Sequence, residues 1–288
     1  MRALRTLATA ALFAALALPA VAAELTDEQK AEVMDFTMHD MTFTLFHESG
    51  HLLIHELDLP VLGKEEDAAD TAGILEMFKT ITDKDEAYNA LNDVADYWTY
   101  SSNAMPDEDF NYNVNTYDPH SLDIQRANNM VCLMVGKDPE EFADTAKAFE
   151  FDDDMTDQCL TDYQEAEHSW TKVLAPYLAK APGPAIKVTY ENPGKYKMLA
   201  DELKSRRILE TVGETLSTTY ALPRPITMTA KLCGEPNAFY EEETHSITFC
   251  YEYADDVYQL GLKSLFAKDT QGSDASEGGD DSEDAGSQ

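Results

Sequence analysis

The stretch LFHESGHLLIHELDLPVLGKEEDAAD, residues 45–70, holds the most specific pattern in this 288-residue chain. It contains the motif His-Glu-x-x-His, in which Glu48 stands directly after His47 and His51 follows four residues on from the first histidine. On a helix, residues four apart lie on the same face, so both imidazoles can reach a single metal ion. Glu48 then stands beside an open coordination position. The pattern predicts a zinc site with Glu48 as the general base.

The flanking residues predict a buried helix around this motif. Apolar side chains recur at helical spacing on both sides of it: Met38, Met41, Phe43, Leu45, Leu52 and Ile54. Gly50 costs roughly 1 kcal/mol of helix propensity, so we expect another backbone to approach closely at this point. His55 continues the spacing of four, but eight residues along a helix span about 12 Å. His55 is therefore too far from His47 to share its ion, and we expect it at the surface or in a supporting role.

A second helix is predicted from residue 65, after a short loop broken by a proline and a glycine. Two helices joined in this way pack as an antiparallel hairpin, which brings Glu66 back toward the histidines. Asp70 lies one turn later on the same face, where it can accept the outer ring N–H of a ligand histidine. Glu65 is the alternative ligand, although its neighbour one turn later, Ala69, could not support a histidine.

The residues after the motif distinguish between two classes of zinc site that share the His-Glu-x-x-His motif. The metzincin pattern would require Gly at 54 and His at 57, where this chain has Ile54 and Leu57. The Glu-x-x-x-Asp pairing on the second helix is similar to the gluzincin arrangement. That similarity implies that both histidines of the motif and Glu66 bind one Zn²⁺ ion.

The rest of the chain predicts an α+β protein, mostly helical in its N-terminal half. Apolar spacing predicts helices between residues 26 and 178, the first of them opened by a capping box of Thr26 and Gln29. Strands are predicted at 186–190, 226–233 and 246–253, with one amphipathic helix over 195–220. We expect a zincin-like fold, in which a helical metal-binding region at 24–180 is completed by an α/β region at 186–267 that contributes a small mixed sheet.

The two ends of the chain are expected to lie outside this fold. Residues 1–23 join two arginines to a short apolar run that ends in small residues, which is typical of a secretory signal peptide cleaved after residue 22 or 23. Residues 268–288 are acidic without apolar anchors and predict a disordered tail. After cleavage, 19 basic residues face 55 acidic ones, a formal charge of −36. Such a negative charge disfavours nucleic acid and anionic lipid as partners, because both are themselves negatively charged. We expect no membrane anchor to remain after cleavage.

The four cysteines fit an exported protein with two disulfides. The simplest pairing joins sequence neighbours, Cys132 with Cys159 and Cys233 with Cys250, while the other two connectivities remain open. No pair shows the Cys-x-x-Cys spacing of a zinc ribbon.

Three segments of the chain resemble a family of bacterial exported proteins described as zinc metallopeptidases of unknown function. They are residues 46–70, HSLDIQRANNMVCLMVGKDPEEF at 120–142, and LPRPITMTAKLCGEPNAFYEEETHSITFCYEY at 222–253. In most zincin folds the strand region precedes the metal helix, whereas here it follows. We interpret this as a circularly permuted order, which can still place the same sheet beside the same helix.

Four further residues are candidates for substrate handling. His120, at the predicted start of a helix, is the first candidate to stabilise an oxyanion, and Arg126 is the second. Asn237 and Tyr240 are expected to line the substrate cleft. The sequence thus predicts a secreted or periplasmic zinc peptidase acting on peptides or proteins, with an unknown oligomeric state. The alternatives are an inactive zinc-stabilised binding protein, or hydrolysis of a non-peptide amide at the same site.

Overall fold

The computed structural model describes residues 25–104 and 118–266; the predicted signal peptide and acidic tail lie outside the described residues. The helices are α1 (Asp27–Glu56), α2 (Glu65–Thr80), α3 (Lys84–Ala104), α5 (Asp123–Lys137), α6 (Ala143–Ala148), α7 (Asp153–Leu174), α8 (Lys197–Ser205), α9 (Ile208–Thr219) and α10 (Tyr251–Ser264). The strands are β1 (Lys187–Tyr190), β2 (Thr227–Lys231), β3 (Ala238–Glu241) and β4 (Ser246–Cys250), with short 3₁₀ turns at Ala175–Tyr177 and Gly194–Tyr196. This is the α+β architecture that the sequence predicts.

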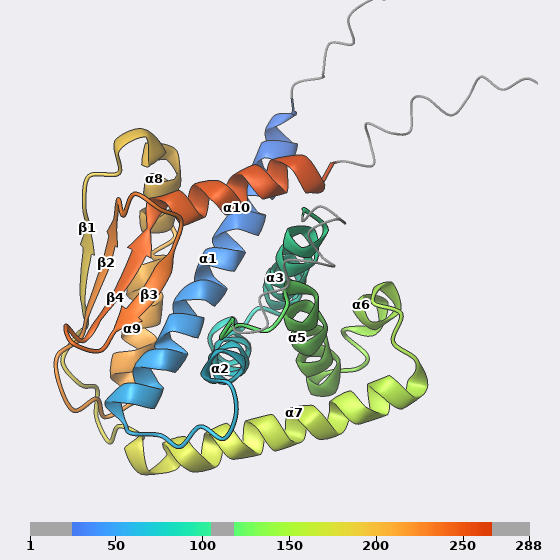
Figure 1. Ribbon diagram of the computed structural model, residues 1–288, viewed down its shortest axis with the longest axis horizontal. Coiled ribbons are helices and arrows are strands. Elements are labelled where there is room, and N and C mark those ends of the chain that lie inside the picture. The colour runs from blue at the N-terminus through green and yellow to red at the C-terminus, as the bar shows by residue number, and fades with distance from the viewer. Residues whose placement is uncertain (1–24, 105–117, 267–288) are drawn as a thin grey trace, which may run out of the picture.

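Helix α1 is the central element of the fold. The sheet lies on one side of it and α2, α3 and α5 on the other, while α10 crosses near its N-terminal end (Figure 1). Thr26 and Gln29 form the predicted capping box at its start. Because α1 is covered on several sides, apolar residues are buried all around it rather than along one stripe: Val33, Phe36, Met38, Met41, Phe43, Leu45, Phe46, Leu52 and Leu53.

Helices α1 and α2 pack closely through small residues. A Cβ added to Gly50 would lie 2.9 Å from the Cα of Ala69, and one added to Gly73 would lie 3.0 Å from the ring of Phe43. The backbone approach that the sequence predicts at Gly50 is therefore present. Small side chains on both helices allow His47 and His51 of α1 to meet Glu66 of α2.

The sheet is mixed, with strand order β1-β2-β4-β3. Strands β1, β2 and β4 run parallel, and β3 is antiparallel to β4 at one edge. This edge strand lies against α1 (Figure 1). The strand region thus reaches α1, which carries the His-Glu-x-x-His motif, although it comes later in the chain.

Three sequence predictions of secondary structure were wrong in detail. The helix predicted over 195–220 is interrupted at Arg207, whose φ of 56° is left-handed and cannot continue a right-handed helix. No glycine or proline marks this break. The strand predicted over 246–253 ends at Cys250, where α10 begins, because the alternating pattern continues into the first helical residues. The segment between the last two predicted strands contains a further strand, β3, which the predicted ranges omit.

Both disulfides have the predicted pairing. Cys132–Cys159 joins α5 to α7, and Cys233–Cys250 joins the segment after β2 to the end of β4. The second bond closes the connection that carries β3. It therefore restricts the position of the edge strand beside α1.

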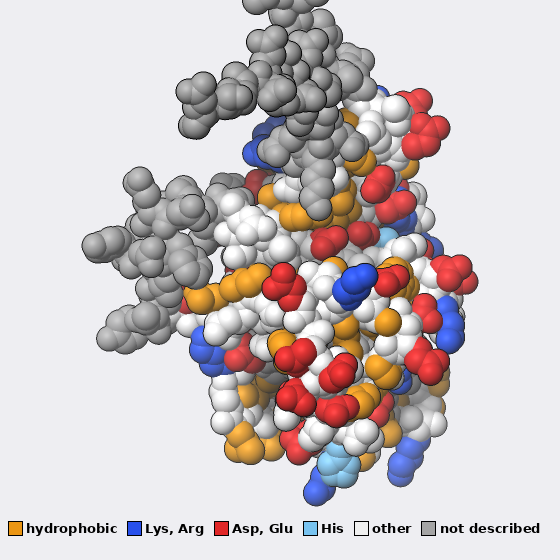
Figure 2. Space-filling view, turned by 90° about the vertical axis from the view of Figure 1, so that its right-hand side faces the viewer, with side chains coloured by type: hydrophobic (Ala, Val, Ile, Leu, Met, Phe, Trp, Pro, Cys, Tyr) orange, Lys and Arg blue, Asp and Glu red, His pale blue; other side chains and the backbone are white. Residues whose placement is uncertain are grey.

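The surface is strongly acidic. Figure 2 shows carboxylate side chains spread over the face that looks to the right in Figure 1, with lysines and arginines fewer and apart. None of the described helices is long and apolar enough to cross a membrane.

One carboxylate, that of Asp40 on α1, is fully buried. Its Oδ2 accepts a hydrogen bond of 3.0 Å from the Tyr253 hydroxyl, while its Oδ1 has no hydrogen-bond partner among the described residues. Burial raises the pKa of Asp40 to about 7. An unfolded aspartate has a pKa of about 3.9. Because the folded state holds the proton more tightly, Asp40 lowers stability as pH rises from about 4, with its full cost above about 7.

We therefore expect Asp40→Asn to remove part of the pH dependence of stability. From pH 5.5 to pH 8.5, the free energy of unfolding of the variant should rise by about 2 kcal/mol relative to that of the wild type, since each pKa unit corresponds to about 1.4 kcal/mol. Urea unfolding at both pH values measures this difference. A difference in the free energy of unfolding between the two proteins that is the same at both pH values would contradict the expectation. Asp35→Asn, at a half-exposed carboxylate of the same helix, is the control.

Candidate metal centre

Three side chains from α1 and α2 bring their ligand atoms together in a nearly equilateral triangle. His47 Nε2 lies 3.2 Å from His51 Nε2, and Glu66 Oε2 lies 3.3 Å and 3.2 Å from these two nitrogens. These residues form a group that could hold a metal ion. A tetrahedral zinc site with bonds of about 2.0–2.1 Å has ligand-to-ligand separations of about 3.3 Å. The donor set and its spacing therefore fit Zn²⁺.

The outer nitrogens of both histidines are held by carboxylates. His47 Nδ1 donates to Asp70 Oδ1 over 2.8 Å, and His51 Nδ1 donates to Glu65 Oε1 over 2.7 Å. With each Nδ1 carrying the donated proton, each Nε2 is left as the lone-pair nitrogen that a metal requires. The carboxylates thus fix both the orientation and the tautomer of the two rings.

The charge of the cluster favours a cation at its centre. Burial opposes a positive charge on His47, but the carboxylates of Asp70 and Glu66 outweigh it and raise the pKa of His47 to about 9. Burial likewise opposes the charge of Glu66, but hydrogen bonds from His120 and both motif histidines lower its pKa. A metal ion would replace the protons that these carboxylates otherwise stabilise.

Glu48 is buried beside the ligand triangle. Its Oε2 accepts a 2.8 Å hydrogen bond from the backbone N–H of Tyr240 in β3, and its residue is 7 % exposed. Burial raises the pKa of Glu48, although His47 and His51 oppose the rise. A raised pKa suits a carboxylate that must accept and return a proton.

Tyr240 is held in place through both its backbone and its side chain. Its hydroxyl donates to Glu56 Oε1 over 2.7 Å, and its ring stacks on His55 at 5.9 Å between centroids. Glu56, the last residue of α1, also lies 3.0 Å from Arg224 Nε and accepts from His245 Nδ1 over 2.7 Å. These contacts attach the sheet to α1 and hold the Tyr240 backbone against Glu48.

His120 lies at the entrance to the site. It precedes α5 in a turn rather than starting the helix, and its Nε2 is 3.1 Å from Glu66 Oε2. Its side chain is 45 % exposed, and the hydrogen bond to Glu66 raises the pKa of His120. Lys64 donates to the backbone carbonyl of His120 over 3.0 Å, which attaches this turn to the start of α2.

The ligand triangle opens into a cavity of about 620 Å³. Among the residues that the sequence analysis assigned to the substrate cleft, Asn237 and Tyr240 line this cavity. Arg126 does not: it lies behind Asp70, with its side chain 7 % exposed, and lines a separate cavity. An oxyanion role for Arg126 therefore has no support, because the guanidinium is committed to Asp70 away from the ligand triangle.

Sequence reasoning missed two supporting contacts. Glu65, considered only as an alternative ligand, accepts from His51 and from His55 Nε2 over 2.9 Å. The signal was available in the spacing, because His51 and His55 lie one turn apart and face the first turn of α2. The contact between Glu48 and the Tyr240 backbone has no such signal, since it joins residues 192 positions apart.

Together the two helices define a candidate metal centre with two histidines, a glutamate and an adjacent carboxylate base, open to a cavity. Residues 16–174 and 190–279 match the protein family described as "Putative metallopeptidase". The chain belongs to this family. No curated protein and no solved structure matches the chain.

Proposed function

We propose that this protein is an exported zinc-dependent peptidase. The observation that carries this proposal is the triangle of His47, His51 and Glu66, with the buried carboxylate of Glu48 beside it. Membership of the metallopeptidase family supports the reaction class. A zinc ion that only stabilises a fold needs no base next to an open position, so Glu48 favours catalysis over a structural role.

The ligand residues would be His47, His51 and Glu66. When bound, a zinc ion supplies Lewis acidity, which lowers the pKa of water to about 7 and polarises a carbonyl group. Glu48 accepts the proton of the attacking water at Oε1, because its Oε2 is engaged by the Tyr240 N–H. Glu48 then returns this proton to the leaving amine. His120, at the cavity entrance, is the candidate donor to the developing oxyanion, a role that requires its Nε2 to turn away from Glu66 Oε2.

Strand β3 supports a peptide as the substrate. The backbone oxygen of Asn237 accepts a hydrogen bond from the backbone N–H of Cys250. In this antiparallel pair, the backbone N–H and C=O groups of the odd-numbered residues therefore point toward β4. The N–H of Tyr240 faces the opposite way, toward Glu48, and Ala238 shares its direction. Ala238, which lines the cavity, therefore directs its backbone N–H and C=O away from β4. An extended peptide can pair with such an edge, which would align its scissile bond along the metal site.

Export is supported by the two disulfides, which require an oxidising compartment, together with the N-terminal signal pattern. N-terminal sequencing of the mature protein should find a chain that begins at residue 23 or 24. An intact Met1 in the secreted or periplasmic fraction would contradict cleavage.

The metal content of the purified mature protein tests the proposal most directly. We expect near-stoichiometric zinc by elemental mass spectrometry, and its loss in His51→Ala and Glu66→Ala, because each variant removes one of three ligands. His168→Ala, at an exposed histidine of α7, is the matched control and should keep its zinc. A wild-type protein that remains zinc-free after zinc is supplied would overturn the peptidase proposal.

A further inference from the structure

We propose, on the basis of the metal site of the proposed function, that Arg126 is a positioning residue that fixes the metal ligand His47 through Asp70. Arg126 lies on α5, and its guanidinium contacts the Asp70 carboxylate on α2 instead of lining the cavity at the ligand triangle. Its Nε donates to Asp70 Oδ2 over 2.8 Å, and its Nη2 donates to Asp70 Oδ1 over 2.6 Å. This two-point contact holds both carboxylate oxygens and sets the plane of the carboxylate.

Arg126 is itself held in place by an aromatic ring. The guanidinium carbon lies 3.4 Å from the centroid of the Trp98 ring, on α3. The Arg126 side chain is 7 % exposed and that of Asp70 is 11 % exposed. A stacked, buried guanidinium has few alternative orientations, so it restricts the Asp70 carboxylate more strongly than a flexible surface cation would.

The restraint passes from Asp70 to the metal ligand. Asp70 Oδ1 accepts from Arg126 and also from His47 Nδ1, over 2.8 Å. With Arg126 in place, the carboxylate can hold His47 in only one ring orientation, with Nε2 directed at His51 and Glu66. Without it, the carboxylate is free to rotate within the protein and the histidine ring moves with it. Four helices thus contribute in sequence to the position of one ligand atom.

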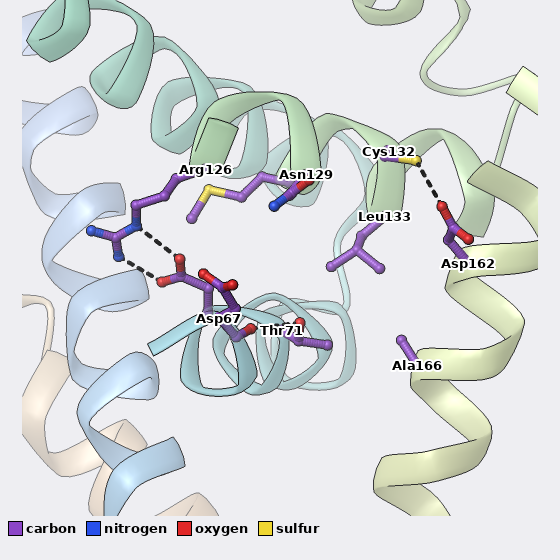
Figure 3. A pocket seen from close by; sticks show the side chains of 10 residues that line it. Asp67, Thr71, Arg126, Asn129, Cys132, Leu133, Asp162 and Ala166 are labelled. Atoms are coloured by element: carbon purple, nitrogen blue, oxygen red, sulfur yellow. Dashed lines mark hydrogen bonds and ion pairs between the residues drawn. The ribbon is translucent and has the colours of Figure 1, made fainter. Parts of the chain in front are cut away.

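A second cavity gives access to this pair from behind the metal site. It measures about 220 Å³ and shares no lining residue with the larger cavity. Figure 3 shows Arg126 at one end of this cavity and Asp162 at the other. The Arg126→Ala variant would enlarge it next to Asp70. A small guanidinium compound could then occupy the position of the missing side chain.

Zinc affinity, measured by competition with a chromophoric chelator, tests the positioning role without requiring a substrate. We expect the dissociation constant to rise about 10- to 100-fold in Arg126→Ala, as when other residues that orient metal ligands are removed. Arg126→Lys keeps the charge but loses the two-point contact, and should show an intermediate rise. Millimolar methylguanidinium should restore affinity in Arg126→Ala but leave the wild type unchanged. Arg206→Ala, which removes the ion pair with Asp35, is the matched control.

The outcomes separate this inference from the proposed function. Wild-type protein that binds no zinc overturns both. Zinc-binding wild type with equal affinity in folded Arg126→Ala and Arg126→Lys overturns only the role of Arg126. A fall in thermal stability without a change in zinc affinity also overturns it, since Arg126 would then act in folding alone. Reduced affinity that methylguanidinium restores supports the positioning role.

Discussion

Replacing Glu48 by Gln is expected to reduce peptide hydrolysis about 1,000-fold while leaving zinc bound, because general-base catalysis contributes roughly 10²- to 10⁴-fold to rate. Gln has nearly the same shape as Glu, and its amide oxygen can still accept the Tyr240 N–H that Glu48 accepts. The substituted side chain cannot take a proton from water. The variant therefore removes the base without removing a ligand of the metal group.

The measurement combines turnover of a quenched fluorescent peptide library with zinc content on the same samples. Equal zinc in wild type and Glu48→Gln, with hydrolysis only in the wild type, supports the base. Glu214→Gln is the matched control, since it makes the same chemical change at an exposed glutamate of α9 that does not line the cavity. Hydrolysis by Glu48→Gln at the wild-type rate would contradict the base role. A zinc-loaded wild type that cleaves no library member would favour a binding protein.

Local spacing in the sequence predicted the helical hairpin and the clustering of its candidate ligands. The motif histidines, Glu66 and Asp70 all lie on two adjacent helices, where the helical repeat determines which side chains share a face. Gly50 was informative for the same reason, because a residue unfavourable to a helix interior marks a close contact. The pairing of cysteines that are neighbours in sequence, which was the simplest of the three connectivities, is also the one present in the structure.

The parts that were missed depend on contacts between distant segments. The contact of Tyr240 with Glu48 arises only when the sheet packs on α1, and the position of Arg126 behind Asp70 depends on how α5 packs on α2. A basic residue near a predicted site can lie on either side of a ligand helix, and helical spacing does not distinguish the two. The break at Arg207 has no glycine or proline to reveal it.

Replacing Gly136 by Ala is expected to destabilise the protein more than the same replacement at any other glycine of the described helices. A Cβ at this position of α5 would lie 2.1 Å from the backbone oxygen of Cys159 and 2.6 Å from the Cβ of Tyr163, both on α7. Carbon and oxygen atoms normally approach no closer than about 3.3 Å. Alanine would otherwise improve helix propensity by about 1 kcal/mol, so a purely local view predicts stabilisation.

The two helices cannot simply separate to make room. The Cys132–Cys159 disulfide joins them one turn away, so α5 and α7 would have to rotate about this bond and lose contacts with the core. We expect a loss of more than about 3 kcal/mol, at the upper end for overpacking. For a chain of this size that corresponds to a fall of about 10 °C in Tm.

Thermal unfolding of Gly136→Ala and Gly63→Ala provides the matched comparison. Gly63 has a negative φ and no atom within 4 Å of an added Cβ, so its replacement should change Tm by no more than a degree or two. Equal Tm values for the two variants would contradict the close contact of α5 with α7. A large fall in Gly136→Ala should also weaken zinc binding in the folded fraction, because α5 carries Arg126, which holds the Asp70 carboxylate behind His47.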